Sequence, residues 1–328
     1  MSFLNKNFFI RFAIIDAVFF IVFYFTFVFT FPIKEIVDNN KEDIAQKTKK
    51  IIKYDDISLG LGLSLKIKNL EIIEDNNKKE KTSKTTKDDK KNKISSLKME
   101  SLTIKPNIMA MISSRKADLD FDAMLMGGEI SGNFSVITEI KGKGKTKKIE
   151  KNKVTLNIED INLKKISDYL NLDLPYSGKI NGDVKTVFAT MRGKPVISYL
   201  NLDLDLNDTK LGPGKVKAMG SYVTIDAIRL GSFKLKGSTP KNSSKFKLEP
   251  VKINSPDLKA DLEGSITFSR SIMPNLKLKF KFTDELLENN KKIRAVMSGI
   301  TNLKRKDGYY GVKLTGTLKH LRQRPWLR

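Results

Sequence analysis

The sequence predicts a mainly β protein, with an N-terminal transmembrane helix followed by an elongated, curved antiparallel β-sheet body and a few short helices. Residues 12–31 form an apolar run whose single charged side chain at neutral pH is Asp16. As a helix, such a run spans roughly 30 Å, the thickness of a bilayer's hydrocarbon core. Beyond it, many short runs alternate apolar with polar residues, which is the period of a strand with one apolar face.

The apolar run is predicted to be retained as a membrane anchor. A cleaved signal peptide has a shorter apolar run that ends in small residues, whereas this run ends in bulky side chains. Residues 1–33 are therefore interpreted as a cytoplasmic tail and an anchor. The anchor is dominated by phenylalanines, at Phe12, Phe19, Phe20, Phe23, Phe25, Phe27, Phe29 and Phe31.

The orientation of the anchor does not follow from charge, because lysines flank the run on both sides. Long domains cross a membrane largely regardless of charge, and a short basic tail before an uncleaved anchor commonly stays in the cytoplasm. We therefore place the bulk of the chain outside the cytoplasm, with the membrane as its first partner.

The composition excludes several classes of function. The chain has no cysteine and one histidine, His320, so it lacks thiol catalysis, disulfides, the usual general base and histidine metal clusters. It contains no nucleophile elbow, no HExxH motif and no Walker loop. We predict that the protein is not an enzyme and has no catalytic residue, cofactor or metal site.

The formal net charge of +24 does not indicate nucleic acid as a partner. The lysines are dispersed along nearly every segment and mostly alternate with apolar residues, as on a solvated sheet face. No nucleic-acid-binding motif accompanies them.

After the anchor, the pattern changes from helical to extended. Apolar residues recur at helical spacing over 34–53, which predicts a juxtamembrane amphipathic helix. Residues 54–328 form the β-rich body. Leucines alternate over 59–67 and predict one strand. Two alternating runs within 119–136 flank the pair Gly127-Gly128 and predict a hairpin with a tight turn at these glycines.

Other segments interrupt the alternation. The lysine-rich stretches 75–93 and 141–153 are predicted to be flexible loops. A last strand is expected over 310–318, and the tail after it carries Trp326, which either contacts a partner or packs on the sheet edge. Short helical segments are predicted at 108–112, 161–170 and 284–300.

The candidate site is apolar. Alternation places two sets of side chains on one face of their strands, where they either close a core or line an open groove, because both arrangements have the same sequence pattern. Asp203 and Asp205 share the opposite, polar face, where solvation is favoured over cation binding. The apolar candidates are Leu200, Leu202, Leu204, Leu206, Leu276, Leu278 and Phe280.

An ordered set of segments carries a resemblance to a known family. These are YDDISLGLGLSLKIKNLEI (54–72), MLMGGEISGNFSV (124–136), YSGKINGDV (176–184), LNDTKLGPGKVK (206–217), SPDLKADLEGSITFSR (255–270) and KDGYYGVKLTGTLKHLRQRP (306–325). Together they resemble the GspN family, the N component of type II protein secretion systems. The resemblance implies a non-enzymatic, single-pass inner-membrane protein with a periplasmic β body that contacts other secretion-system subunits. It supplies no catalytic residues.

A second family gives the alternative function. An anchored sheet with one apolar face also resembles AsmA-like and lipopolysaccharide-transport bodies, whose curved sheets hold acyl chains. In that case the apolar candidates would contact lipid rather than one another, and the protein would bind or transfer lipid.

Overall fold

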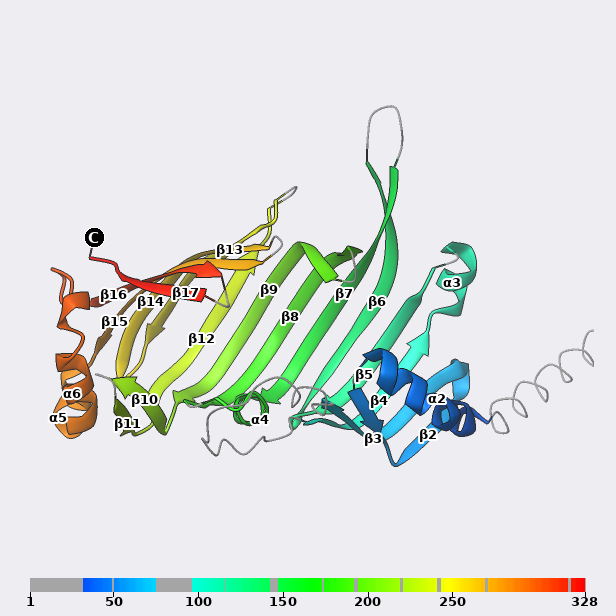
Figure 1. The fold of residues 1–328 in the computed structure, drawn as a ribbon, viewed down its shortest axis with the longest axis horizontal. Helices are drawn as coiled ribbons and strands as arrows, with labels where there is room; N and C mark the ends of the chain where they lie inside the picture. Colours follow the sequence, from blue (N-terminus) through cyan, green and yellow to red (C-terminus); the bar gives the residue numbers. More distant parts are fainter. Residues whose placement is uncertain are drawn as a thin grey trace, which may run out of the picture. The chain divides into compact units, whose positions relative to one another are not determined.

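The computed structural model is mainly β (Figure 1). It describes residues 32–48, 50–74, 96–114, 116–141, 147–172, 174–191, 194–218, 221–240, 243–268, 271–317 and 320–327. The predicted anchor at 12–31 and the predicted loop at 75–93 lie outside these residues. None of the helices within them combines the length and apolar character needed to cross a bilayer.

The chain divides into two compact units, Met1–Pro106 and Asn107–Arg328, where the sequence analysis expected one body from residue 54. In the first unit the pairing order is β1-β3-β4, and β2 also pairs with β3. All of these pairings are antiparallel. Its described elements are α2 (Ile33–Thr48), β1 (Lys50–Lys53), β2 (Asp56–Gly60), the 3-10 turn η1 (Leu61–Leu63), β3 (Ser64–Glu74) and β4 (Ser96–Pro106).

Helix α2 is shorter than the predicted helix at 34–53. It ends at Thr48, and Lys50–Lys53 pair as β1 with the end of β3. A polar cluster joins the helix to the residue after β1. The Tyr54 hydroxyl donates to Asp38 Oδ1 at 2.7 Å, and Lys41 Nζ lies 4.1 Å from the centre of the Tyr54 ring. The hydrogen bond from Lys41 lowers the pKa of Asp38.

The single strand predicted over 59–67 is wrong, because the chain reverses within it. Residues 61–63 form a 3-10 turn, with φ of +71° at Gly62 and +58° at Leu63. Leu59 and Leu65 then pair across the β2–β3 hairpin. Directly paired residues point to the same face, so the leucine alternation of a hairpin is the same as that of one strand.

The second unit is built on one antiparallel sheet in the order β5-β6-β7-β8-β9-β12-β13-β14-β15-β16-β17, with a separate hairpin, β10–β11. Figure 1 shows strands β6, β7, β8, β9 and β12 lying side by side across this sheet. The strands are β5 (Asp118–Leu125), β6 (Gly128–Lys141), β7 (Lys147–Asn162), β8 (Tyr176–Met191), β9 (Lys194–Leu211), β10 (Gly214–Ala218), β11 (Ser221–Ile225), β12 (Ile228–Ser238), β13 (Lys245–Asn254), β14 (Leu258–Phe268), β15 (Ile272–Phe282), β16 (Tyr310–Thr317) and β17 (His320–Pro325).

The hairpin predicted within 119–136 is confirmed as β5–β6, but its turn lies one residue earlier than expected. Leu125 pairs with Gly128, so the two turn residues are Met126 and Gly127. Both have positive φ, +54° and +79°, as the favoured two-residue hairpin turn requires. Gly128 is needed for a different reason, since a Cβ there would overlap the backbone of Glu159.

The basic stretch predicted as a loop at 141–153 is mostly strand. β7 begins at Lys147 and pairs with β6 without interruption from Lys141↔Lys147 to Glu129↔Glu159. Ladder hydrogen bonds therefore extend the hairpin despite the lysines. Charge density predicted a loop here, and backbone pairing with the neighbouring strand overrides it.

Short helices follow the strand ends of the second unit, close to the predicted positions. Helix α4 begins at an N-cap, where the Asn162 side chain accepts from the backbone of Lys164 at 2.9 Å. The helical segment expected at 284–300 is two helices separated by Asn290, whose side chain caps the second one by accepting from Ile293 N at 3.0 Å. The helices are α3 (Ile108–Ser114), α4 (Leu163–Tyr169), α5 (Asp284–Asn289), α6 (Lys291–Ser298) and the 3-10 turn η2 (Thr301–Leu303).

The first prediction concerns Gly182, in the middle of β8. Its φ is +129°, and a Cβ there would overlap the carbonyl oxygen of Asp203 on β9. Gly182→Ala should therefore lower the free energy of unfolding by more than the roughly 1 kcal/mol expected from backbone strain alone. Urea unfolding followed by circular dichroism measures the change.

Gly308→Ala is the matched control, because Gly308 also has positive φ, +80°, but no atom within 4 Å of the added Cβ. An equal loss of stability in the two variants would contradict the close approach of β8 and β9.

Candidate functional site

The apolar residues of the second unit share one face of the sheet. The pairing register connects them strand by strand, and paired residues in an antiparallel ladder point the same way. One row across the sheet consists of Phe121, Gly132, Leu156, Val184, Leu202, Gly237, Leu248, Gly264, Leu276 and Leu314. We call the face that contains this row the apolar face.

Glycines in the row make room for large rings. A Cβ at Gly237 would overlap the ring of Phe246, and one at Gly132 would lie 3.1 Å from the ring of Phe121. Phe246 is one of the most buried side chains described, at 2% exposed. These two glycines are therefore needed because a larger side chain would collide with the neighbouring rings.

The structure brings the predicted apolar candidates onto this single face. Leu202 on β9 and Leu276 on β15 belong to the same row, connected through β12, β13 and β14. Leu200, Leu204 and Leu206 lie on the same side of β9, as the strand period requires. Leu278 and Phe280 follow Leu276 along β15 in the same way.

The predicted candidates on the apolar face are mostly half-buried, whereas Phe246, Val251 and Ala260 on the same face are buried. Of the seven candidate residues, Leu204 alone is buried, at 7% exposed, and the other six are half-buried. In the described residues, the one other sheet of this unit is the β10–β11 hairpin. A sheet packed face to face on a second sheet would bury such leucines fully. The open alternative of the sequence analysis therefore fits this face better than a sealed core.

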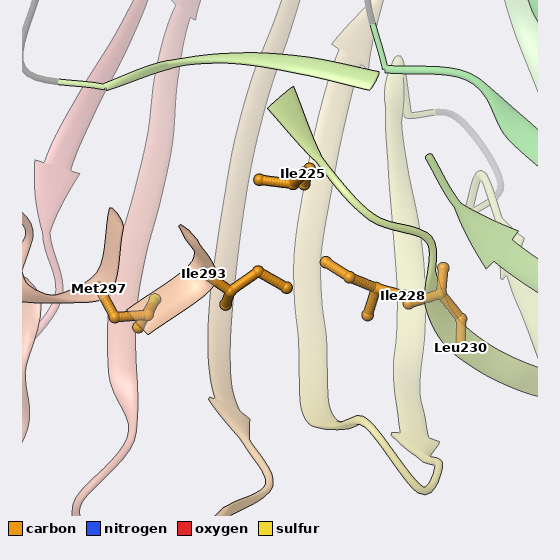
Figure 2. Close-up of a cluster of buried hydrophobic side chains, with 5 residues drawn as sticks. All are labelled: Ile225, Ile228, Leu230, Ile293 and Met297. Atoms are coloured by element: carbon orange, nitrogen blue, oxygen red, sulfur yellow. The ribbon is translucent and has the colours of Figure 1, made fainter. Parts of the chain in front are cut away.

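One end of the apolar face is capped by a compact cluster (Figure 2). Ile225 of β11, Ile228 and Leu230 of β12, and Ile293 and Met297 of α6 are buried together. Figure 2 shows the two helix residues facing the three sheet residues. We call this cluster, with α5, α6 and the β10–β11 hairpin, the cap.

Phe280 belongs to the cap rather than to the half-open part of the face. Its ring is stacked on Tyr310 with centroids 5.8 Å apart and meets Phe282 edge-on at the same distance. All three rings pack against the buried cluster. The cap therefore covers the ends of β15 and β16 and leaves Leu276 and Leu278 beyond it.

A buried carboxylate joins strand β12 to the turn between β13 and β14, next to the cap. Asp257, in the turn between β13 and β14, is 4% exposed. It accepts from the backbone N of Arg229 at 2.7 Å and from the Arg229 Nε at 3.0 Å. Hydrogen bonding to the Arg229 side chain is the main reason that the pKa of Asp257 is lowered, and burial partly opposes it. The same pair raises the pKa of Arg229.

The opposite face of the sheet is polar and carries cross-strand ion pairs. A carboxylate oxygen of Asp203 on β9 lies 2.7 Å from Lys236 Nζ on β12. A carboxylate oxygen of Asp205 lies 3.0 Å from Lys234 Nζ on the same strand. The hydrogen bond to Asp203 raises the pKa of Lys236. The two aspartates are therefore compensated by lysines. No group of three or more acidic or histidine side chains suited to a metal ion occurs in the described part of the chain.

The same arrangement recurs between β14 and β15. Asp261 lies 2.8 Å from Lys279 Nζ, and Glu263 lies 3.2 Å from Lys277 Nζ. An acidic strand thus lies beside a basic strand at two places in the sheet.

Sequence reasoning missed the cap contacts and the last strand. Arg229 and Asp257 are 28 residues apart, and no local period connects them. Strand β17 escaped notice because its alternation is masked by arginines and ends at Pro325. Trp326, just beyond it, packs on the edge of the sheet, which is one of its two predicted roles. Arg305 Cζ lies 4.6 Å and Lys277 Nζ 5.2 Å from the centre of its ring.

Comparison with protein-family models, curated proteins and solved structures finds no match for this chain.

The second prediction follows from Asp257. Since its pKa is lower in the folded than in the unfolded protein, its ionised form stabilises the fold above the unfolded pKa of about 3.9. That contribution is lost as the pH falls through the folded value. Asp257→Asn should lower the unfolding free energy at neutral pH by about 1.5–3 kcal/mol and remove this acid-dependent part.

Urea unfolding of both proteins between about pH 7 and pH 3 measures the difference. Asp284→Asn is the control, because Asp284 is an exposed residue of the first turn of α5. Parallel pH profiles for wild type and Asp257→Asn would contradict the role of Asp257.

Proposed function

We propose that this protein is a non-enzymatic, membrane-anchored periplasmic protein whose elongated, curved sheet holds the acyl chains of lipid against its apolar face. The observation that carries the proposal is the apolar face with its half-buried leucines, continuous across the register from β5 to β16. Apolar surface of this extent on a soluble domain marks a binding site. Acyl chains match it because they are apolar along their length and need no hydrogen-bond partners.

The distribution of polar groups supports lipid over a small polar ligand. In the row from Phe121 to Leu314 every residue is apolar or glycine, so the row offers no side-chain donor or acceptor to orient a polar molecule. The cap closes one end of the face with the buried cluster around Ile293. This function matches the AsmA-like alternative of the sequence analysis.

The anchor and the location belong to the same proposal. The phenylalanine-rich run at 12–31 has the length and composition of a spanning helix, and it would tether the sheet to the inner membrane, next to a supply of lipid.

The third prediction tests lipid binding directly. A photoreactive benzoylphenylalanine replacing Leu202 or Leu278, both half-buried on the apolar face, should form lipid adducts in cells, detected by mass spectrometry of the purified full-length protein. The same probe replacing Asn201, on the polar face of β9, is the matched control.

Leu202→Asp should also reduce the amount of lipid that copurifies. Because Leu202 is half-buried, the change places a charge where water can reach it, and the circular dichroism spectrum should remain that of a β protein. Equal adducts from both faces, or none from either, would contradict the proposal.

A second candidate function is the one implied by the GspN resemblance, a type II secretion component that acts through protein contacts. The exposed strand at the end of the sheet favours it, since all six residues of β17 are exposed. An exposed edge strand offers backbone donors and acceptors to a strand of another protein.

The fourth prediction separates the two candidates. Deleting the gene in a host that uses type II secretion should reduce export of the secreted proteins if the contact function holds, measured by mass spectrometry of the culture medium. A plasmid copy restores export in the control strain. Unchanged export of every substrate would exclude the secretion function and leave the lipid proposal standing.

A further inference from the structure

We infer that the outer edge of β17 is a docking site for a strand of a different protein, in which acidic residues alternate with apolar ones. The inference rests on the contact function proposed above and adds the chemistry of the partner. It is independent of lipid binding by the apolar face.

The sheet itself shows which neighbour a basic strand takes. The lysines of β12 face the aspartates of β9, and the lysines of β15 face Asp261 and Glu263 of β14, with ion-pair distances between 2.7 and 3.2 Å. On the other face of these strands the paired residues are apolar, as in Leu204↔Leu235 and Leu262↔Leu278. Strands β12 and β15 therefore each lie beside a strand that alternates acidic with apolar residues.

Strand β17 is basic but has no acidic neighbour. Its arginines point to the polar face, and on the inner side they meet β16, where Arg324 is paired with Lys313 and Arg322 with Thr315. Like charges directly opposite each other destabilise a ladder. In the described part of the chain, no acidic side chain lies within ion-pair distance of Lys313, Arg322 or Arg324. An acidic strand on the outer side would compensate them.

The other face of β17 indicates why the partner strand should carry apolar residues between its acidic ones. Leu321 pairs with Gly316 and continues the apolar face, yet it is 48% exposed. An apolar residue on an added strand would cover it, as Leu235 covers Leu204 inside the sheet.

The edge is held in place before any partner arrives. Trp326 N donates to Gly311 O at 2.9 Å, and Arg305 Nη1 donates to Trp326 O at 3.0 Å. These bonds fix the chain just after Pro325, and a pre-ordered edge loses less conformational entropy on binding.

A second copy of the chain does not fit this edge. Pairing β17 with β17 would oppose arginines to arginines. The first unit has two edge strands, β1 and β2, and both pair with β3. β1 carries Lys50 and Lys53, so pairing it with β17 would also oppose like charges. β2 carries a single acidic residue, Asp56, which is too few to compensate both arginines. The charges therefore select a heterologous partner.

The fifth prediction uses a capped, fluorescently labelled peptide that alternates aspartate with valine. It should bind the full-length protein, with an affinity that falls at high salt because the attraction is between exposed charges. Bound peptide should slow hydrogen exchange of the backbone amides of β17. A peptide with lysine in place of aspartate should not bind.

Reversing the edge charge should reverse this preference. The variant with Arg322→Glu and Arg324→Glu should lose affinity for the aspartate peptide by at least about tenfold and gain it for the lysine peptide. The control variant, with Lys245→Glu and Lys247→Glu, has the same charge change on exposed side chains of the inner strand β13, and it should bind like wild type.

Arg322→Gln with Arg324→Gln replaces the reversed variant if circular dichroism shows that the latter does not fold. Three results would overturn the inference: no binding of the aspartate peptide to wild type, equal loss in the β13 control, or protection from exchange elsewhere than β17. Concentration-dependent dimers in sedimentation that require Arg322 and Arg324 would instead identify a second copy as the occupant and would also overturn it. None of these results bears on lipid adducts at Leu202.

Discussion

The register of the antiparallel ladder is the constraint on which the rest of this protein depends. Side chains alternate with a period of two, so a slip of one residue in any strand would move that strand's apolar side chains to the polar face. One register shift lies beside the row from Phe121 on β5 to Leu314 on β16, at Glu249–Pro250 of β13. Two residues of β13 oppose one of β14 there, and the one extra residue returns Val251 to the apolar side. Val251 is 4% exposed. The bulge therefore preserves the face rather than interrupting it.

The register places the apolar side chains on one face but does not cover them. At one end of the face, the cap covers them. Met297 and Ile293 bury the beginning of β12, and the Asp257 carboxylate satisfies both the backbone and the side chain of Arg229. Buried carboxylates are costly unless they are hydrogen-bonded and paired, and this one is both. A buried hydrophobic cluster of the second unit thus lies at the cap, while Leu202, Leu276 and Leu278 are half-buried.

The sequence predicted the mainly β character, the β5–β6 hairpin and the short helices because each depends on local period and turn chemistry. It did not predict the reversal at Gly62, since leucine alternation is identical for one strand and for a hairpin. It missed β7 before residue 154 because the lysines there are held by pairing with β6 and not by their own propensity. The candidate leucines could be assigned to one face from period two, but whether that face is sealed or open depends on contacts between distant strands, which no local pattern encodes.

The charge of the chain bears on what can occupy the open face. An uncovered apolar surface is an aggregation liability, and the simplest way to cover it is a second copy. The chain has a formal net charge of +24, and the polar face behind the apolar one carries Lys313, Arg322 and Arg324, which have no acidic partner in the described residues. Two copies stacked through their apolar faces would bring these charged bodies together, and such self-repulsion opposes association. A lipid brings apolar surface without adding positive charge, so the positive charge of the chain favours a small apolar occupant of the face over a second copy.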